Sequence, residues 1–205
     1  MSAKIYGLII AAGLSSRMED FKPLVRYNQK TFIEHIINKL ASVCDEILIV
    51  KGFNGYALED SVKAIYRGDA LLKKIDFVHN QNFEKGMFSS VQVGLKEIFS
   101  EMQNDDYVML HLVDQPHISE HVYQELSRKA RSGDMKVIIP SYNMRAGHPI
   151  VLSQEVVKEI TCTPDSENMR DVLKKFHENT TYVNIQEDSI IQDVNTQEER
   201  KRYLK

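Results

Sequence analysis

A short stretch near the start of the chain carries the residue types that bind phosphate groups. An apolar run leads into small residues and then two cations: Ala11, Ala12, Gly13, Ser15, Arg17 and Lys22. Small side chains let backbone N–H groups approach an anion closely, and the cations can neutralise its charge from both sides. The stretch matches neither the P-loop pattern nor the G-x-G-x-x-G dinucleotide fingerprint. We interpret it as a nucleotide phosphate site at the end of the first strand.

An acidic residue follows a second apolar run. Residues 107–113 read as a buried strand, and Asp114 comes directly after them, followed by Gln115 and Pro116. In open α/β sheets, ligands bind beyond the carboxyl ends of the strands, and carboxylate oxygens suit Mg²⁺. The residues alone leave open a second interpretation, in which Asp114 caps the next turn.

Two further segments combine turn residues with hydrogen-bonding groups. Gly86 permits a tight turn, and Ser89 and Ser90 can cap a helix that opens at Val91. Such a cap leaves helix N–H groups available to an acceptor, although it is equally consistent with a simple helix start. In the second segment, His148 follows Gly147 and precedes Pro149, so we expect it in a turn.

These segments together resemble the nucleotidyltransferases with a Rossmann-like fold. The first has the form A-A-G-x-S-x-R-M followed by Lys, and D-Q-P at 114–116, M-F-S-S at 87–90 and G-H-P at 147–149 resemble further motifs of that family. The branch most similar is the molybdenum cofactor cytidylyltransferase group, and the resemblance spans nearly the whole chain. Glu19 stands where the family has Gly, Phe88 where it has a small residue, and Asn195 where it has a second Asp.

The resemblance implies a reaction and a set of roles. An acceptor phosphate attacks the α-phosphorus of a nucleoside triphosphate, and pyrophosphate leaves. The implied catalytic residues are Arg17, Lys22 and Asp114, and the implied Mg²⁺ ligands are Asp114 and Asn195. The residues implied to bind the nucleotide are Ala11, Ala12, Gly13, Ser15, Arg17, Lys22, Gly86, Ser89 and Ser90. Those implied to bind the acceptor are Gly147, His148 and Arg170. A phosphate acceptor is already deprotonated, so His148 is expected to position it rather than to act as a base. From the residues alone, Arg170 is better explained as a solvated cation on a helix. Asn195 can also be explained as a helix N-cap.

The same resemblance sets an expectation for the substrates. The Ala-Ala-Gly start resembles the cytidylyl-transferring branch, so we expect CTP rather than GTP, with a phosphorylated small molecule such as molybdopterin as the acceptor and a molybdoenzyme as a possible partner. The choice between CTP and UTP stays open. Two alternatives also stay open: a sugar- or alcohol-phosphate nucleotidyltransferase, and a non-catalytic nucleotide-binding accessory protein of molybdoenzyme maturation.

Apolar runs alternate with helical patterns along most of the chain. We expect strands at 4–10, 46–50, 75–78, 107–113, 136–140, 149–152 and 181–185. Thr31 and Glu34 form a capping box before a helix, Ser119 can cap another, and further helices are expected at 167–177 and 197–203. The pattern predicts a single α/β domain over 1–205, with three layers and a doubly wound, mostly parallel sheet.

Composition limits the remaining classes. With 205 residues, 42% of them hydrophobic, and a net charge of −3, the chain is typical of a globular domain that does not bind nucleic acid non-specifically. Cys44 and Cys162 are expected to be buried free thiols, and no spacing indicates zinc. No apolar run is long enough for a membrane helix and no signal peptide is evident, so we expect a cytoplasmic protein without a membrane partner.

Overall fold

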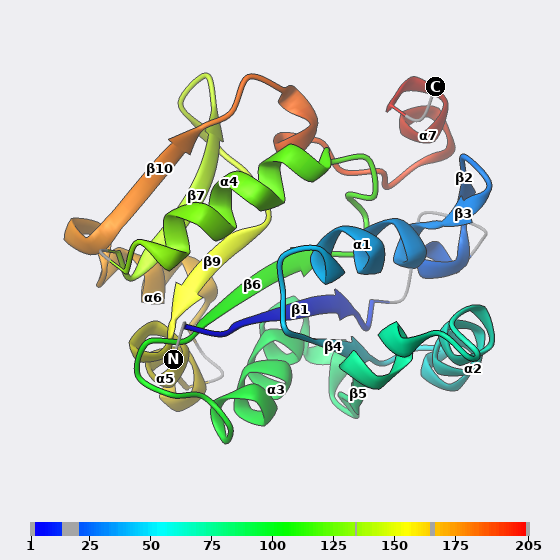
Figure 1. Ribbon diagram of the computed structural model, residues 1–205, viewed down its shortest axis with the longest axis horizontal. Helices are drawn as coiled ribbons and strands as arrows, with labels where there is room; N and C mark the ends of the chain where they lie inside the picture. The colour runs from blue at the N-terminus through cyan, green and yellow to red at the C-terminus, as the bar shows by residue number, and fades with distance from the viewer. Residues whose placement is uncertain (1–2, 14–20, 134, 165–166, 204–205) are drawn as a thin grey trace.

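The centre of the protein is an 8-stranded, mostly parallel sheet with the order β10-β7-β9-β6-β1-β4-β5 and β8 paired to β7 (Figure 1). The computed structural model describes residues 3–13, 21–133, 135–164 and 167–203. The strands of this sheet are β1 (Ile5–Ala11), β4 (Glu46–Lys51), β5 (Ile75–His79), β6 (Tyr107–Leu112), β7 (Val137–Tyr142), β8 (Arg145–Ala146), β9 (Ile150–Ser153) and β10 (Thr180–Asn184). Strand β9 runs antiparallel to both β6 and β7, and β8 antiparallel to β7. All the predicted strands are present.

Helices cover both faces of the sheet, so the predicted three-layer, doubly wound α/β fold is confirmed. The helices are α1 (Phe32–Ala41), α2 (Gly55–Ile65), α3 (Met87–Phe99), α4 (Glu120–Arg131), α5 (Gln154–Cys162), α6 (Met169–Lys174) and α7 (Gln197–Tyr203). Apolar residues of α1, α2 and α4 form one buried cluster with the sheet, and those of α3, α5 and α6 form the other. Strand β1 contributes alternate residues to the two clusters, Ile9 to the first and Ile10 to the second, because successive side chains point to opposite faces.

Several local predictions hold and others need correction. Thr31 and Glu34 form the expected capping box at the start of α1. The cap predicted at Ser89 and Ser90 is wrong. Helix α3 begins earlier, at Met87 with Gly86 as its N-cap, so both serines lie inside its first turns. Ser119 stands at the N-cap of α4 but its side chain makes no capping hydrogen bond. The helix predicted over 167–177 is shorter, since α6 ends at Lys174. Helices α2 and α5 and the small hairpin of β2 (Arg26–Tyr27) and β3 (Lys30–Thr31) were not predicted.

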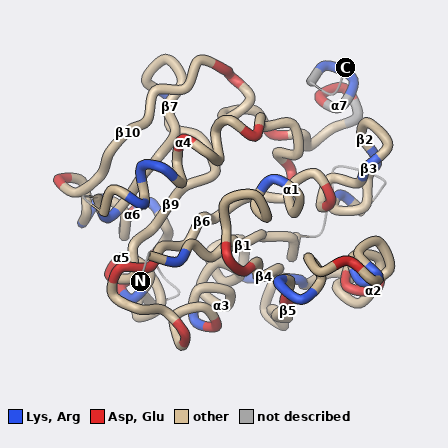
Figure 2. Tube along the Cα trace, viewed as in Figure 1, with Lys and Arg blue, Asp and Glu red and all other residues tan. Residues whose placement is uncertain are grey.

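The cysteines and charges complete the description. Both cysteines are free as expected, but only Cys44 is buried; Cys162, at the end of α5, is exposed. Acidic and basic residues are interspersed along the chain (Figure 2). Within the described residues, no helix is long and apolar enough to cross a membrane.

Candidate functional site

A cleft of about 590 Å³ opens where β1 and β6 end, at the carboxyl edge of the parallel strands. Such an edge is where open α/β sheets bind ligands. The cleft is lined by seven of the predicted site residues, namely Ala11, Gly13, Lys22, Gly86, Ser90, Asp114 and Asn195. These residues come from the start, the middle and the end of the chain, and the fold brings them to one place. Ser15 and Arg17 lie outside the described residues.

Three of the lining residues meet through their side chains. Nζ of Lys22 donates a hydrogen bond to Oδ1 of Asn195 over 2.8 Å, and it lies 3.6 Å from Oδ2 of Asp114. Lys22 opens a 3-10 turn over Lys22–Leu24, Asp114 follows β6, and Asn195 precedes α7. One ammonium group therefore contacts oxygen atoms from the middle and from the last part of the chain.

The Asp114 carboxylate is held in a poorly solvated place. Burial raises its pKa above the usual value, an effect that Lys22 partly offsets, and the nearby Asp193 adds to the rise. Its Oδ1 atom is buried and has no hydrogen-bond partner among the described residues. A divalent cation would relieve this unfavourable burial, and the donor set of a carboxylate and an amide oxygen is of the kind that Mg²⁺ prefers. The residues present fit the metal that the family resemblance implies.

A buried asparagine organises the start of α3 at the edge of the cleft. Asn80, 1% exposed, donates through Nδ2 to the hydroxyls of Ser89 and Ser90 over 2.9 Å each. The Ser89 hydroxyl also bonds the carbonyl of Gly86 over 2.8 Å, so it is engaged in the turn, while Ser90 lines the cleft. Gly86 has φ +102° and ψ 174°, a conformation that glycine adopts without strain. Asn80 is a site residue that sequence analysis missed, since nothing in the local pattern distinguishes it from a loop asparagine.

The two alanines after the first strand lie deeper than expected. Ala11 and Ala12 are each 1% exposed, and they pack into the clusters on opposite faces of the sheet. Ala11 contributes to the lining of the cleft, whereas Ala12 packs on the side of α3. The Ala12 carbonyl accepts a hydrogen bond from the Phe53 N–H over 3.3 Å. The structure therefore places Ala11 at the cleft and Ala12 in the core, so Ala12 does not have the predicted place in the lining.

The Gly147-His148-Pro149 turn packs against the segment that leads to Asn195. The Gly147 N–H bonds the Pro140 carbonyl over 2.9 Å, and the His148 N–H bonds the Ile190 carbonyl over 3.0 Å. A Cβ atom on Gly147 would lie 2.3 Å from that same Ile190 oxygen, so only glycine fits. Burial lowers the pKa of His148, which keeps its imidazole neutral near pH 7. A neutral imidazole can accept or donate a hydrogen bond, as a positioning residue requires.

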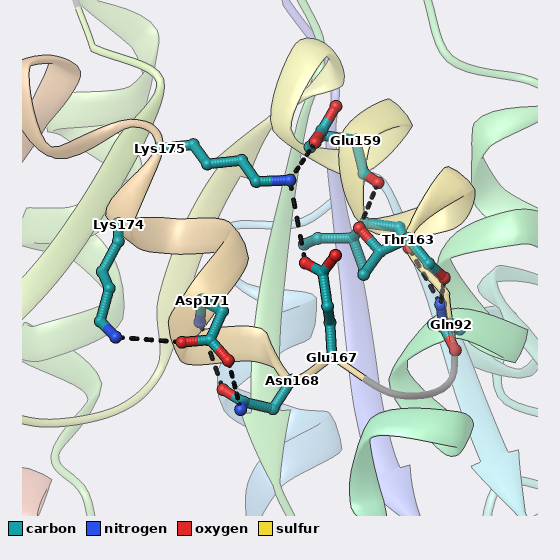
Figure 3. Close-up of polar contacts among 9 residues, drawn as sticks. Gln92, Glu159, Thr163, Glu167, Asn168, Asp171, Lys174 and Lys175 are labelled. Atoms are coloured by element: carbon teal, nitrogen blue, oxygen red, sulfur yellow. Dashed lines mark hydrogen bonds and ion pairs between the residues drawn. The ribbon is translucent and has the colours of Figure 1, made fainter.

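Arg170 lies apart from the other predicted site residues. It is an exposed residue of α6, and it is not among the residues that line the cleft. Figure 3 shows how α6 is tied to α5: Lys175, just after α6, pairs with Glu159 of α5 over 2.7 Å and with Glu167 over 3.8 Å. Helix α5 packs in turn against α3 through Gln92, whose amide donates to the Thr163 carbonyl over 2.7 Å. These contacts hold α6 in the helical layer, so Arg170 lies on that layer and not in the lining of the cleft.

Comparison with known proteins agrees with this geometry. Residues 7–181 match the family described as the MobA-like NTP transferase domain. The chain belongs to this family. It is therefore a nucleotidyltransferase, and the cleft at the ends of β1 and β6 is its candidate nucleotide site.

Individual proteins resemble the chain over most of its length. A molybdenum cofactor cytidylyltransferase of Escherichia coli (strain K12) is 26% identical over 189 residues, covering 92% of this chain and 90% of that protein. A probable molybdenum cofactor guanylyltransferase of Bacillus mycoides (strain KBAB4) is 24% identical over 157 residues, covering 77% and 72%. The solved structure of a nucleotidyl transferase from Methanothermobacter thermautotrophicus shares the fold, with a TM-score of 0.77, 18% identity and coverage of 98% and 96%.

Proposed function

We propose that this MobA-like protein transfers CMP from CTP to the phosphate group of a small-molecule acceptor such as molybdopterin, with Mg²⁺ as cofactor. The observation that carries the proposal is the meeting of Lys22, Asp114 and Asn195 at one cleft. A cation beside two metal-binding oxygens is an arrangement that suits a triphosphate and its magnesium ion. The product would be handed to a molybdoenzyme in the cytoplasm.

The proposed reaction asks little covalent chemistry of the protein. An oxygen of the acceptor phosphate forms a bond to the α-phosphorus of CTP, the bond from that phosphorus to the bridging oxygen breaks, and pyrophosphate leaves with the electron pair. The protein contributes by orienting the two reactants and by stabilising charge in the transition state. Bound Mg²⁺ supplies positive charge beside the phosphate oxygens.

The predicted site residues have the following roles in this proposal. Asp114 and Asn195 hold the metal, and Lys22 stabilises the charge that develops on the phosphate groups. The backbone at Gly13 cradles phosphate, and the family resemblance assigns Arg17 a contact with the triphosphate. The turn at Gly86 and the hydroxyl of Ser90 contact the nucleoside. On the acceptor side, Gly147 and His148 position the second substrate.

The choice of CTP is supported by the cytidylyltransferase relative from Escherichia coli and by the Ala11-Ala12 pair. Ala11 lines the cleft, and Ala12 is buried on the opposite face of the sheet. A methyl-sized change beside a pocket is worth roughly 1–3 kcal/mol of discrimination between ligands. That is enough to favour a pyrimidine over a purine.

Labelled nucleotides test the proposal directly. The purified protein is incubated with molybdopterin, Mg²⁺ and each of the four nucleoside triphosphates labelled at the α-phosphate, and both pyrophosphate and labelled acceptor are measured. We expect the fastest transfer with CTP. Tighter binding and faster transfer of GTP would overturn the cytidylyl assignment and leave the nucleotidyltransferase assignment intact. Nucleotide binding without pyrophosphate release, with sugar- and alcohol-phosphates also inactive, would identify an accessory nucleotide-binding protein.

A substitution outside the described residues adds a second test. Arg17→Ala should lower kcat more than it raises KM, because a contact to developing charge strengthens in the transition state. A rise in KM alone would restrict Arg17 to ground-state binding.

A further inference from the structure

Residues 190–195, which we call the C-terminal strap, join the two sides of the candidate site. At its start, the Ile190 carbonyl accepts from the His148 N–H over 3.0 Å. At its end, Asn195 reaches the cleft and accepts from Lys22 over 2.8 Å. The strap therefore has to be held in register with the loop that carries Asp114, or the two oxygen ligands would not face one another.

Gln115, the neighbour of Asp114, makes that connection. Its side chain is buried, with the residue 1% exposed, and Nε2 donates to Oδ1 of Asp193 over 2.9 Å. Directly beside this bond, the Val194 N–H donates to the Asp114 carbonyl over 2.9 Å. One side-chain bond and one backbone bond thus join adjacent residues of the strap to adjacent residues of the loop.

An apolar contact fixes the same part of the strap from another direction. Val194 is fully buried against Val25 and Phe32. Val25 closes the 3-10 turn that begins at Lys22, and its carbonyl accepts from the Phe32 N–H over 2.9 Å. The segments that carry Lys22, Asp114 and Asn195 therefore converge on Val194, with Gln115 as the polar side of the junction.

The burial of Gln115 carries a cost that its packing does not explain. Its Oε1 atom is buried and has no hydrogen-bond partner among the described residues. An unpaired buried acceptor is destabilising, and an apolar side chain of similar size would avoid the penalty. What a glutamine supplies here, and a methionine or leucine does not, is the Nε2 donor directed at Asp193.

We propose that Gln115 is a positioning residue, which sets the separation of Asp114 and Asn195 by holding the C-terminal strap through Asp193. The proposal rests on the metal-binding role given to Asp114 and Asn195 under the proposed function. It does not depend on the acceptor or on the base of the nucleotide. Groups that orient metal ligands typically affect metal affinity by about 10- to 100-fold when they are removed.

The polarity of the Gln115–Asp193 bond can be reversed, which gives a sharp test. Gln115→Met keeps the size of the side chain and removes the donor. Asp193→Asn keeps an oxygen that can accept from Gln115. Gln115→Glu places two acceptors opposite one another, and the double variant Gln115→Glu/Asp193→Asn restores a hydrogen bond that runs the other way at unchanged net charge. Gln124→Met is the matched control, because Gln124 donates to Glu120 over 3.3 Å on the exposed surface of α4.

Two measurements that need no acceptor read out the result. The first is the affinity for Mn²⁺, followed by electron paramagnetic resonance with each nucleoside triphosphate in turn. The second is hydrogen exchange of the Val194 amide, which reports the strap itself. Using every nucleotide separates this test from the choice of CTP, since a wrong base assignment changes which nucleotide binds and leaves the comparison between variants intact.

Gln115→Met should weaken Mn²⁺ binding about ten-fold and speed exchange at Val194. Gln115→Glu should speed that exchange as well, whereas the double variant and Gln124→Met should match the wild type in both measurements, and Asp193→Asn should match it in the exchange at Val194. Unchanged Mn²⁺ affinity in Gln115→Met would overturn the proposal. A double variant whose Val194 amide exchanges as fast as in Gln115→Glu would also overturn it. So would an Asp193→Asn variant that binds Mn²⁺ as weakly as Gln115→Met, since the Asp193 charge itself would then bind the metal. If Gln115→Met does not fold, the reversed pair decides alone.

Discussion

Lys22 and Asn195 are separated by 173 positions in the sequence, yet the lysine ammonium donates to the asparagine side-chain oxygen over 2.8 Å. The same ammonium lies 3.6 Å from the Asp114 carboxylate. Lys22 therefore lies close to both oxygen atoms that we propose as metal ligands, and a metal ion bound to both of them would compete with this ammonium. In this proposal, the charge of the side chain at position 195 determines how strongly a metal ion competes with the Lys22 ammonium.

Changing Asn195 to Asp should strengthen metal binding. The added charge attracts a divalent ion by at least about 1 kcal/mol, the value for two unit charges about 4 Å apart in water. We expect Asn195→Asp to lower the Mg²⁺ concentration that gives half-maximal activity by about five-fold or more, measured by titrating Mg²⁺ at saturating nucleotide. Asn195→Leu, which has no oxygen ligand, should raise it. An Asp variant that needs as much Mg²⁺ as the wild type would remove residue 195 from the metal site.

Changing Asp114 to Asn should separate catalysis from folding. The substitution keeps the shape of the side chain and removes a buried charge whose pKa is raised by desolvation. We therefore expect the melting temperature without metal to be unchanged or higher, and turnover to fall about 100- to 1000-fold. The two quantities are measured on the same preparation, by thermal unfolding and by pyrophosphate release at saturating Mg²⁺. Turnover near the wild-type value would exclude Asp114 from the metal site.

The buried pair of His111 and Tyr123 should make the protein sensitive to acid. The two rings stack 5.5 Å apart, Oη of Tyr123 lies 2.6 Å from Nε2 of His111, and Nδ1 lies 2.7 Å from the Leu112 carbonyl. The carbonyl can only accept, so Nδ1 carries the proton and Nε2 accepts from the tyrosine. Burial lowers the pKa of His111 to about 3.

The direction of the acid effect follows from this lowered pKa. The unfolded chain binds a proton at His111 near its ordinary pKa of about 6.5, and the folded protein does not until about 3. The contribution of His111 to the free energy of unfolding is therefore complete above that ordinary pKa. It falls by about 1.4 kcal/mol per pH unit as the pH drops through the window.

Urea unfolding between about pH 7 and pH 4 measures this loss against a variant that cannot titrate at position 111. His111→Leu/Tyr123→Phe removes both hydrogen-bonding partners and leaves none unpaired, so its stability should fall less steeply than that of the wild type. Other buried histidines, such as His148, add the same slope to both proteins. Equal slopes would show that His111 takes up a proton in the folded state.

Gly86 and Gly13 should respond differently to an added methyl group. Gly86 has φ +102° with ψ 174°, so Gly86→Ala forces an L-residue into a strained conformation at a cost of about 1–3 kcal/mol. At Gly13 a Cβ atom would meet no atom of the described residues within 4 Å, although the residue lines the cleft. We expect Gly86→Ala to lower the melting temperature, and Gly13→Ala to keep it while raising the KM for the nucleotide. Loss of stability in both variants would assign Gly13 a structural role.

Sequence patterns were a good guide to the sheet and a poorer guide to the surrounding elements. Continuous apolar runs such as 107–113 identified the central strands β1, β4 and β6, because strands buried on both faces leave that signal. Helix α5 could have been found, since Val156, Val157 and Ile160 have helical spacing and are all buried. Helix α2 has a weaker signal in the sequence, because its N-cap residue, Asn54, is in a left-handed conformation and makes no capping hydrogen bond.

The candidate site shows where local patterns stop being informative. The motifs that directly follow predicted strands indicated the position of the cleft, because parallel strands end at a common edge of the sheet. The bonds of Asn195 to Lys22 and of Gln115 to Asp193 join segments far apart in the chain, and no periodicity encodes them. The helix cap expected of Asn195 belongs to Thr196, whose hydroxyl accepts from the Glu199 N–H over 3.1 Å. Asn195 is thereby left available to the cleft.

The position of the C-terminal strap has a consequence during synthesis of the protein. Ribosomes release the chain from its first residue onward, so the sheet strands β1, β4, β5 and β6 can pair before residues 190–195 emerge. The side-chain oxygen of Asn195 and the contacts that Val194 makes with Val25 and Phe32 are added only after those strands. A growing chain therefore lacks the hydrogen bonds of Asn195 to Lys22 and of Asp193 to Gln115 until the strap is added, so the cleft acquires its final polar lining after the strands that carry it.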